Sequence, residues 1–194
     1  MKYRIDLKIS SSNDWINTVI ANFDLFLIDH ANCERKASAM AMSFVAKYAN
    51  RQEILSELID IGIEELEHFK EVYQIMESRG IMLPNEIGQD FYINRLIEIC
   101  RSGRDERFMD RLLLASLVET RGAERFKLVY ENINEVDLKS FYRKLWASEA
   151  RHGEVFVRMC LNFFDEKSVY KRLGEMIEFE GQILESLPIK AALH

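Results

Sequence analysis

Proline and glycine are scarce in this chain of 194 residues, which contains two prolines and eight glycines. Strand sandwiches and barrels need a turn about every 8–12 residues, and these two residue types form many of those turns. Their scarcity argues against an all-β fold and favours long helices. The length suffices for one domain with a sizeable core and is short for two ordinary domains. We therefore expect residues 1–194 to form a single all-α domain with a core at about 11–185.

Closely spaced cysteines are also missing. Cys33, Cys100 and Cys160 lie far apart in the sequence and form no CxxC pair. Disulfide frameworks, zinc knuckles and rubredoxin-type iron sites all need paired cysteines, so the sequence argues against each of them. We interpret the three cysteines as small hydrophobic residues of the interior.

No apolar run is long enough to cross a membrane. The most apolar stretch, LLLASLV at 112–118, is far shorter than the roughly 20 residues that a spanning helix requires. The N-terminus, MKYRIDLKIS, alternates charged and apolar residues and lacks the apolar core of a signal peptide. Together with the unpaired cysteines, these features predict a cytoplasmic protein without a membrane partner.

Acidic residues outnumber basic ones, with 32 Asp and Glu against 26 Lys and Arg and a formal net charge of −6. This balance excludes a uniformly basic surface for nucleic acid but leaves room for a local basic patch. The segment 101–111 holds four arginines, which Asp105, Glu106 and Asp110 largely offset, so we interpret it as a mixed, solvated surface. The candidate basic residues for a patch are Arg35, Lys36, Arg101, Arg104, Arg107, Arg111, Arg121, Arg125, Arg143, Lys144 and Arg151.

Apolar residues spaced three and four apart predict six helical segments separated by short breaks. They span about 13–48 with a kink near residue 22, 51–79, 86–101, 105–131, 135–164 and 166–185. The first ten and the last eight residues are expected to be tails. Four segments have about 25 residues or more, which corresponds to about 40 Å each. Long helices joined by short links pack as an antiparallel bundle, so we predict a four-helix bundle with additional shorter helices.

Two of the four histidines follow a glutamate by three positions, in ELEH at 65–68 and EARH at 149–152. Positions i and i+3 share a helix face, so each carboxylate and imidazole point the same way. A further glutamate precedes each motif by about thirty residues, Glu34 before the first and Glu119 before the second. The whole pattern recurs after 84 or 85 residues, as two similar helix hairpins would produce.

Each of these glutamates lies on a helix stripe that is otherwise apolar or small. A buried carboxylate is costly unless it is paired or bound to a metal ion. Four carboxylates in one core would repel one another, whereas two divalent ions would balance their charge. One Glu from each of two helices and Glu-x-x-His from the other two is the ligand arrangement of di-iron or di-manganese sites in ferritin-like bundles. The predicted metal ligands are Glu34, Glu65, His68, Glu119, Glu149 and His152.

Other interpretations stay open at this point. Glutamates on helices are usually solvated, and a metal-free helical interaction protein is one alternative. Glu64, four positions before His68, competes for the same helix face. His30, four positions before Glu34, is expected to hydrogen-bond that glutamate rather than bind metal, because the set of six ligands is already complete. His194, at the terminus, is expected to be disordered.

Four segments resemble the tRNA 2-methylthio-isopentenyladenosine hydroxylases, a family of the ferritin-like di-iron superfamily. They are DHANCERKA at 29–37, ELEHF at 65–69, LLLASLVETRGAERF at 112–126 and SEARHGEVF at 148–156. The resemblance covers roughly residues 11–185 and implies a ferritin-like fold in which the six predicted ligands hold two iron ions. It further implies an O2-dependent monooxygenase that hydroxylates the isopentenyl group of the modified adenosine beside the tRNA anticodon.

The resemblance also implies partners: a tRNA substrate, O2 as co-substrate, and an external electron donor such as a reductase or a ferredoxin-type protein. It implies no catalytic residue beyond the metal centre. The alternative is a ferritin-like ferroxidase or peroxidase that handles iron or peroxide. Small residues on the helix stripes, among them Ala41, Ala115 and Ser116, leave room for a slim apolar substrate, although small residues also let helices approach one another.

Overall fold

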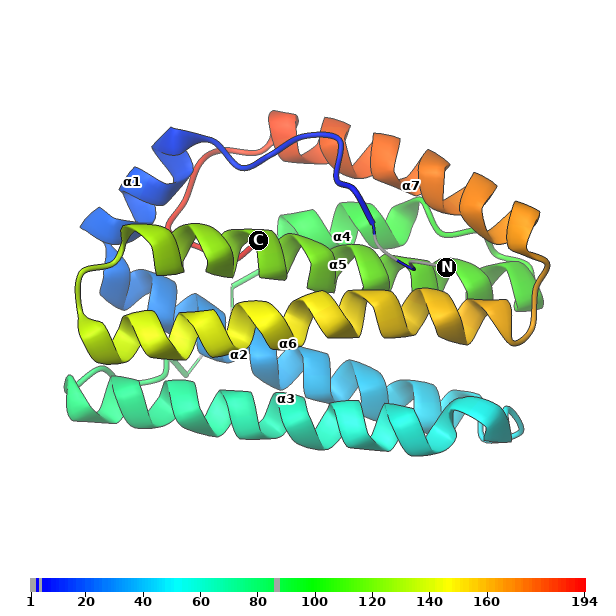
Figure 1. Cartoon of the computed structure of the whole chain (residues 1–194), viewed down its shortest axis with the longest axis horizontal. Coiled ribbons are helices and arrows are strands. Elements are labelled where there is room, and N and C mark those ends of the chain that lie inside the picture. The colour runs from blue at the N-terminus through cyan, green and yellow to red at the C-terminus, as the bar shows by residue number, and fades with distance from the viewer. Residues whose placement is uncertain (1–2, 4, 86–87) are drawn as a thin grey trace. The chain divides into compact units, whose positions relative to one another are not determined.

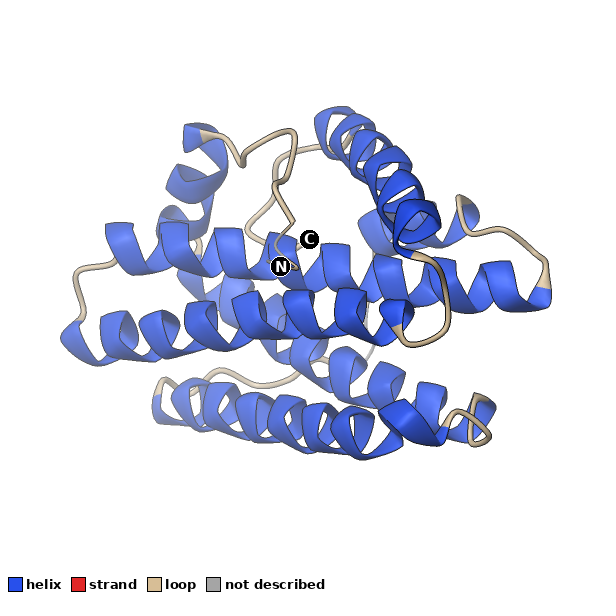
Figure 2. Ribbon diagram, turned by 45° about the vertical axis from the view of Figure 1, so that its right-hand side comes forward, coloured by secondary structure: helices blue, strands red, loops and turns tan. Residues whose placement is uncertain are grey.

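The computed structural model describes residue 3 and residues 5–85 and 88–194. All regular secondary structure in these residues is helical (Figure 1, Figure 2). The helices are α1 (Asn13–Ala21), α2 (Phe23–Lys47), α3 (Gln52–Ser78), α4 (Phe91–Glu98), α5 (Arg104–Asn132), α6 (Val136–Leu161) and α7 (Glu166–Ser186). None of these helices combines the length and the apolar character that a membrane crossing requires.

Most predicted helices agree with the observed ones to within a few residues. The predicted kink near residue 22 is a break at Asn22, whose side-chain amide donates a hydrogen bond to the carbonyl oxygen of Thr18 (2.9 Å). The predicted segment 86–101 is wrong at its start, because α4 begins only at Phe91. There the Asp90 side chain caps the helix by accepting a hydrogen bond from the backbone N–H of Ile93 (3.0 Å). Residues 86 and 87 of that segment lie outside the described residues.

The chain forms two compact units. Unit 1 consists of the described residues of Met1–Ile16 and Gln89–Ile189 together with His194, and unit 2 consists of those of Asn17–Gly88 and Lys190–Leu193. The expectation that residues 1–194 form one domain stays a prediction.

In unit 2, α2 and α3 form an antiparallel hairpin (Figure 1). Apolar side chains from both helices are fully buried, among them Leu27 of α2 and Leu58 of α3. Gly62 allows a close approach, since a Cβ atom at this position would lie 3.5 Å from the Cβ of Ala41. The hydroxyl of Ser38 donates a hydrogen bond to the carbonyl oxygen of Gly62 (2.7 Å), which joins the two helices at this level.

In unit 1, α5 and α6 form a second antiparallel hairpin, and α4 and α7 pack against it (Figure 1). Here too a glycine marks a close approach, because a Cβ atom at Gly153 would lie only 2.6 Å from Oγ1 of Thr120. Ser116 Oγ donates to the carbonyl oxygen of Gly153 (2.5 Å), and Thr120 Oγ1 donates to that of Ser116 (2.7 Å). Ser116 and Gly153 therefore take part in the packing of α5 against α6.

A buried polar network in unit 1 corrects two sequence-based expectations. Arg121 is fully buried, and its Nε donates to Oε1 of Glu180 (2.8 Å), which also accepts a hydrogen bond from the Tyr92 hydroxyl (2.8 Å). Arg125 is 5% exposed, lies 4.7 Å from the Trp15 ring centroid and donates through Nε to Ser11 Oγ (3.1 Å). Both arginines were candidates for a basic surface patch, and both are instead interior residues.

The described residues of the N-terminal tail form no helix before α1, as expected, and they are held in place within unit 1. The backbone N–H of Ser11 donates to Oε1 of Glu124 (2.8 Å), and the carbonyl oxygen of Ile9 accepts a hydrogen bond from Arg121 Nη2 (2.7 Å). The C-terminal tail is also packed, because Leu193 is buried and its backbone N–H donates to Oδ2 of Asp29 (2.6 Å).

All three cysteines are free thiols. Cys33 and Cys160 are buried, in agreement with the interpretation of the cysteines as interior residues, whereas Cys100 is partly exposed. The Cys160 thiol lies 3.8 Å from the carbonyl oxygen of Met109.

Candidate metal centre

The first half of the candidate centre lies in unit 2 and consists of Glu34 of α2 and of Glu65 and His68 of α3. Each residue contributes one possible ligand atom, and these three atoms lie within 4.8 Å of one another. Nδ1 of His68 is 3.6 Å from Oε2 of Glu34 and 3.5 Å from Oε2 of Glu65. All three residues are at most 3% exposed. The two helices therefore bring together three of the six predicted ligands.

Two neighbouring side chains clarify the roles in this first half-site. Nε2 of His30 is 2.7 Å from Oε1 of Glu34, so the predicted hydrogen bond is confirmed, and His30 is fully buried. The Glu64 side chain is 30% exposed, and its Oε1 is 4.0 Å from Nε2 of His68. Glu65 is thus the interior carboxylate beside His68, which resolves the ambiguity between the two adjacent glutamates.

The second half of the candidate centre lies in unit 1 and consists of Glu119 of α5 and of Glu149 and His152 of α6. These residues also offer ligand atoms within 4.8 Å of one another. Nδ1 of His152 is 3.2 Å from Oε2 of Glu149. Glu119 is 6% exposed, Glu149 is 3% exposed and His152 is fully buried. The remaining three predicted ligands are therefore also brought together.

The position of this second half-site depends on the close contact between α5 and α6. Thr120 follows Glu119 directly, and Gly153 follows His152 directly. Thr120 was not among the predicted residues of the centre, although the sequence contains a signal for this contact. Glycine inside a helix is destabilising by roughly 0.5–1 kcal/mol relative to alanine, so Gly153 in the middle of a long helix indicates a packing requirement.

The two half-sites have the same composition and construction. In each, the first helix of a hairpin supplies one glutamate and the second supplies a glutamate and a histidine three positions later. Carboxylate and imidazole groups are ligands that suit iron. Each half-site holds two interior carboxylates, whose charge one divalent ion would balance. The residues therefore fit iron in their chemistry, and metal binding by them stays a prediction.

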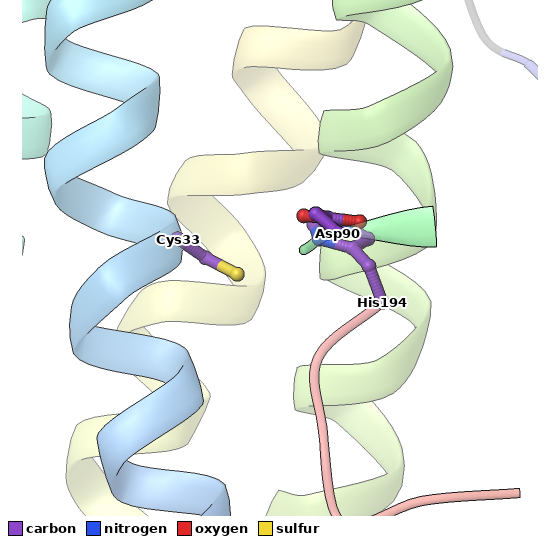
Figure 3. A group of neighbouring side chains, drawn as sticks. All are labelled: Cys33, Asp90 and His194. Carbon is purple, nitrogen blue, oxygen red and sulfur yellow. The ribbon is translucent and has the colours of Figure 1, made fainter. Parts of the chain in front are cut away.

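A further pair of possible ligands lies elsewhere in unit 1. Asp90 and His194 have ligand atoms within 4.8 Å of each other (Figure 3), and the His194 ring stacks on that of Tyr92 with a centroid distance of 5.2 Å. His194 is therefore not the disordered end that the sequence analysis expected. Cys33, also drawn in Figure 3, belongs to unit 2 and donates through Sγ to Oδ2 of Asp29 (3.7 Å). Two donors within one unit do not make a metal site.

Comparison with known proteins identifies the family. The family model for tRNA-(MS[2]IO[6]A)-hydroxylase (MiaE) matches residues 2–194. The chain belongs to this family of hydroxylases, so the resemblance noted in the sequence is confirmed.

Two curated relatives carry the name tRNA 2-(methylsulfanyl)-N(6)-isopentenyladenosine(37) hydroxylase. The one from Pseudomonas putida is 31% identical over 173 residues, which cover 89% of this chain and 83% of the relative. The one from Salmonella typhimurium is 25% identical over 186 residues, which cover 72% of this chain and 68% of the relative.

A solved structure supports the fold class. It is that of "Protein 43 with aldehyde deformylating oxygenase activity" from Synechococcus, with a TM-score of 0.92 and 30% sequence identity, over 97% of this chain and 94% of that one. The predicted all-α, ferritin-like fold class is thereby confirmed.

Proposed function

We propose that this protein is an O2-dependent tRNA monooxygenase. Its substrate is 2-methylthio-isopentenyladenosine next to the anticodon, and it hydroxylates the isopentenyl group of that nucleoside. The observation that carries the proposal is the pair of matching interior half-sites, each with two glutamates and a histidine, in a member of a tRNA hydroxylase family. Family membership supplies the substrate class, and the half-sites supply residues suited to oxidative chemistry.

The proposed centre combines both half-sites in one ferritin-like domain. Its metal ligands are Glu34, Glu65, His68, Glu119, Glu149 and His152. Two bound iron ions would supply the redox chemistry that reduces O2 and oxidises a C–H bond of the prenyl group. The overall reaction consumes one O2, two electrons and two protons, and it yields one hydroxyl group and one water. The electrons come from an external donor, such as a reductase or a ferredoxin-type protein.

The chain's own residues position this chemistry and shield it from water. His30 holds Oε1 of Glu34 through a buried hydrogen bond, which leaves Oε2 facing Nδ1 of His68. Hydrogen bonds to carboxylate ligands fix their orientation and tune their basicity. Burial of all six ligands excludes bulk water, which protects a reactive oxidant from side reactions. A tRNA substrate supports the cytoplasm as the site of the reaction.

Two other activities remain as competing proposals. One is a ferroxidase or peroxidase, which needs the same ligands but no organic substrate. The other follows from the Synechococcus protein, whose title states aldehyde deformylating oxygenase activity and which shares 30% of its sequence with this chain. Both differ from the proposed function in their substrate, so a direct assay of tRNA distinguishes them.

The first test is nucleoside analysis of tRNA by mass spectrometry. Cells that make the prenylated nucleoside but lack this protein should accumulate the unhydroxylated form, and expression of the protein should convert it to a form heavier by one oxygen atom. Purified protein loaded with iron and supplied with an electron donor should incorporate one atom from 18O2 into the same nucleoside. The Glu149→Ala variant should give no conversion. An unchanged nucleoside ratio, with rapid oxidation of added ferrous iron or deformylation of an added aldehyde, would favour the corresponding alternative.

A further inference from the structure

The first turns of α5 carry more positive charge at the surface than the sequence suggests. Asp110 is fully buried and therefore does not offset surface charge. Its Oδ1 accepts a hydrogen bond from Arg101 Nη2 (2.7 Å), and its Oδ2 accepts one from Arg172 Nη2 (3.0 Å). The interpretation of 101–111 as a mixed, solvated surface is thus wrong for Asp110, because this acid lies in the interior with two guanidinium partners.

A second acid in this segment is also engaged. Oε1 of Glu106 is 3.2 Å from Nη1 of Arg101, and the Glu106 carboxylate folds back over Gly103 at the start of α5. Arg101 thus binds both Asp110 and Glu106, and it is not available to a partner. Three arginines of the segment are left: Arg104, Arg107 and Arg111.

These three arginines form no ion pair with any residue that the structure describes. Arg104 and Arg107 are exposed, and Arg111 is partly exposed. Their spacing of three and four places them on one face of α5. They extend over about 10 Å of the helix axis, at 1.5 Å per residue. We call Arg104, Arg107 and Arg111 the arginine face.

The location of the arginine face is unfavourable for stability. The N-terminus of a helix carries partial positive charge, so cations in the first turn are destabilising and anions are stabilising. Arg104 is the first residue of α5, and Gly103 before it provides no side-chain cap. Asp105 and Glu106 in the first turn favour the helix start. The three arginines oppose it and repel one another, and an anionic partner would relieve that repulsion.

We propose that the arginine face binds consecutive phosphates of the tRNA backbone, an inference that rests on the proposed function. About 10 Å of nucleic-acid helix carries about three phosphates per strand, which matches three guanidinium groups in number. Guanidinium groups bind phosphate oxygens through two parallel hydrogen bonds, and all three residues are arginine rather than lysine. A local patch of this kind lets a chain with a net charge of −6 bind RNA.

The test compares two triple variants of the iron-loaded protein. One is Arg104→Gln with Arg107→Gln and Arg111→Gln. The control, Lys47→Gln with Lys70→Gln and Lys167→Gln, removes three positive charges from exposed positions elsewhere on the chain. Binding of prenylated tRNA is measured by fluorescence anisotropy over a range of salt concentrations, and circular dichroism checks that both variants are folded.

The arginine-face variant should bind tRNA about tenfold or more weakly, and its slope of log affinity against log salt should be smaller by about two to three. In the hydroxylation assay its KM for tRNA should rise while kcat stays close to the wild-type value. The control variant should keep the wild-type slope. A wild-type slope for the arginine-face variant would overturn the inference and leave the proposed function intact.

Two further outcomes separate the inference from the proposed function. If the wild type binds tRNA through the arginine face but hydroxylates nothing on it, the surface stands and the proposed function fails. If the arginine-face variant keeps its tRNA affinity but accepts electrons more slowly from an acidic donor protein, the face is a protein-docking surface and the inference is wrong.

Discussion

At the scale of single residues, Asp110 shows how a charge is kept in the interior of unit 1. Burial by itself raises the pKa of Asp110, but the hydrogen bonds from Arg101 and Arg172 outweigh it and hold the pKa below its ordinary value of 3.8. The same carboxylate accepts a hydrogen bond from the backbone N–H of Arg101 (2.8 Å). Asp110 thus connects α5 to α7 and to the segment that precedes α5.

The lowered pKa predicts how Asp110 contributes to stability as the pH changes. A carboxyl group with a depressed pKa in the folded state stabilises the protein fully above its unfolded-state pKa of 3.8 and loses this effect as the pH falls through the folded-state value. Asp110→Asn should lower the free energy of unfolding at pH 7 by about 3 kcal/mol. In urea titrations the difference from the wild type should shrink below pH 3.8. A difference that stays constant into strong acid would contradict this account.

A residue could be recognised from the sequence when its partner lies nearby in the chain. Glu65 with His68, and Glu149 with His152, lie one helical turn apart, so helix periodicity alone placed each pair on one face. Asp110 and Arg121 were taken for surface charges. Arg121 pairs with Glu180 of α7, and Asp110 pairs with Arg172 of α7 as well as with the nearer Arg101. Local periodicity carries no information about such partners.

At the scale of helices, the contact between α5 and α6 at Gly153 is tight enough to test. Gly153→Ala places a methyl group 2.6 Å from Oγ1 of Thr120, which a hydrogen bond to Ser116 keeps in place. The substitution should lower stability by about 1–3 kcal/mol through overpacking, despite the higher helix propensity of alanine. Thermal unfolding measures the effect.

A second substitution shows whether the contact itself is responsible. Thr120→Ala removes Oγ1, so in the double variant most of the stability lost in Gly153→Ala should return. Gly174→Ala on α7 is the matched control, since a Cβ atom there meets nothing within 4 Å. Additive effects of the two substitutions would show that the α5–α6 spacing is set by other residues.

Helix positions were mostly predictable because apolar periodicity spans many residues. The start of α4 was not, since it depends on one side chain: Asp90 accepts the hydrogen bond from Ile93 that ends the preceding loop. The N-terminal tail is a similar case, because a few hydrogen bonds to α5 hold it in place and no periodic pattern signals them.

At the scale of the whole molecule, the proposed centre predicts that bound metal raises the stability of the folded protein. Ions that bind only the folded protein raise its stability by mass action, and their removal leaves clustered interior carboxylates. Iron-loaded protein should therefore unfold at a higher temperature than protein treated with a chelator. Calorimetry on both forms measures this, and equal melting temperatures in a protein shown to bind iron would count against the proposed centre.

Adjacent glutamates on α3 provide a matched pair of variants for the same centre. Glu65→Gln should reduce bound iron from about two ions per chain to one or fewer, because an amide is a poor substitute for an interior carboxylate ligand. Glu64→Gln should leave the iron content unchanged, since that side chain is partly exposed. Elemental analysis reads the ratio directly. Equal losses of iron in both variants would show that the assignment of Glu65 as the ligand is wrong.

The burial of Cys160 has a practical consequence for an enzyme that handles oxygen. Peroxide attacks the thiolate form of cysteine, and burial raises the pKa of Cys160 so far that the thiol stays protonated. Burial also raises the pKa of Cys100, the partly exposed cysteine. These two sulfur atoms should therefore survive repeated turnover in air. Neither Cys100 nor Cys160 therefore needs protection by dithiothreitol, a reagent that would otherwise compete for the iron.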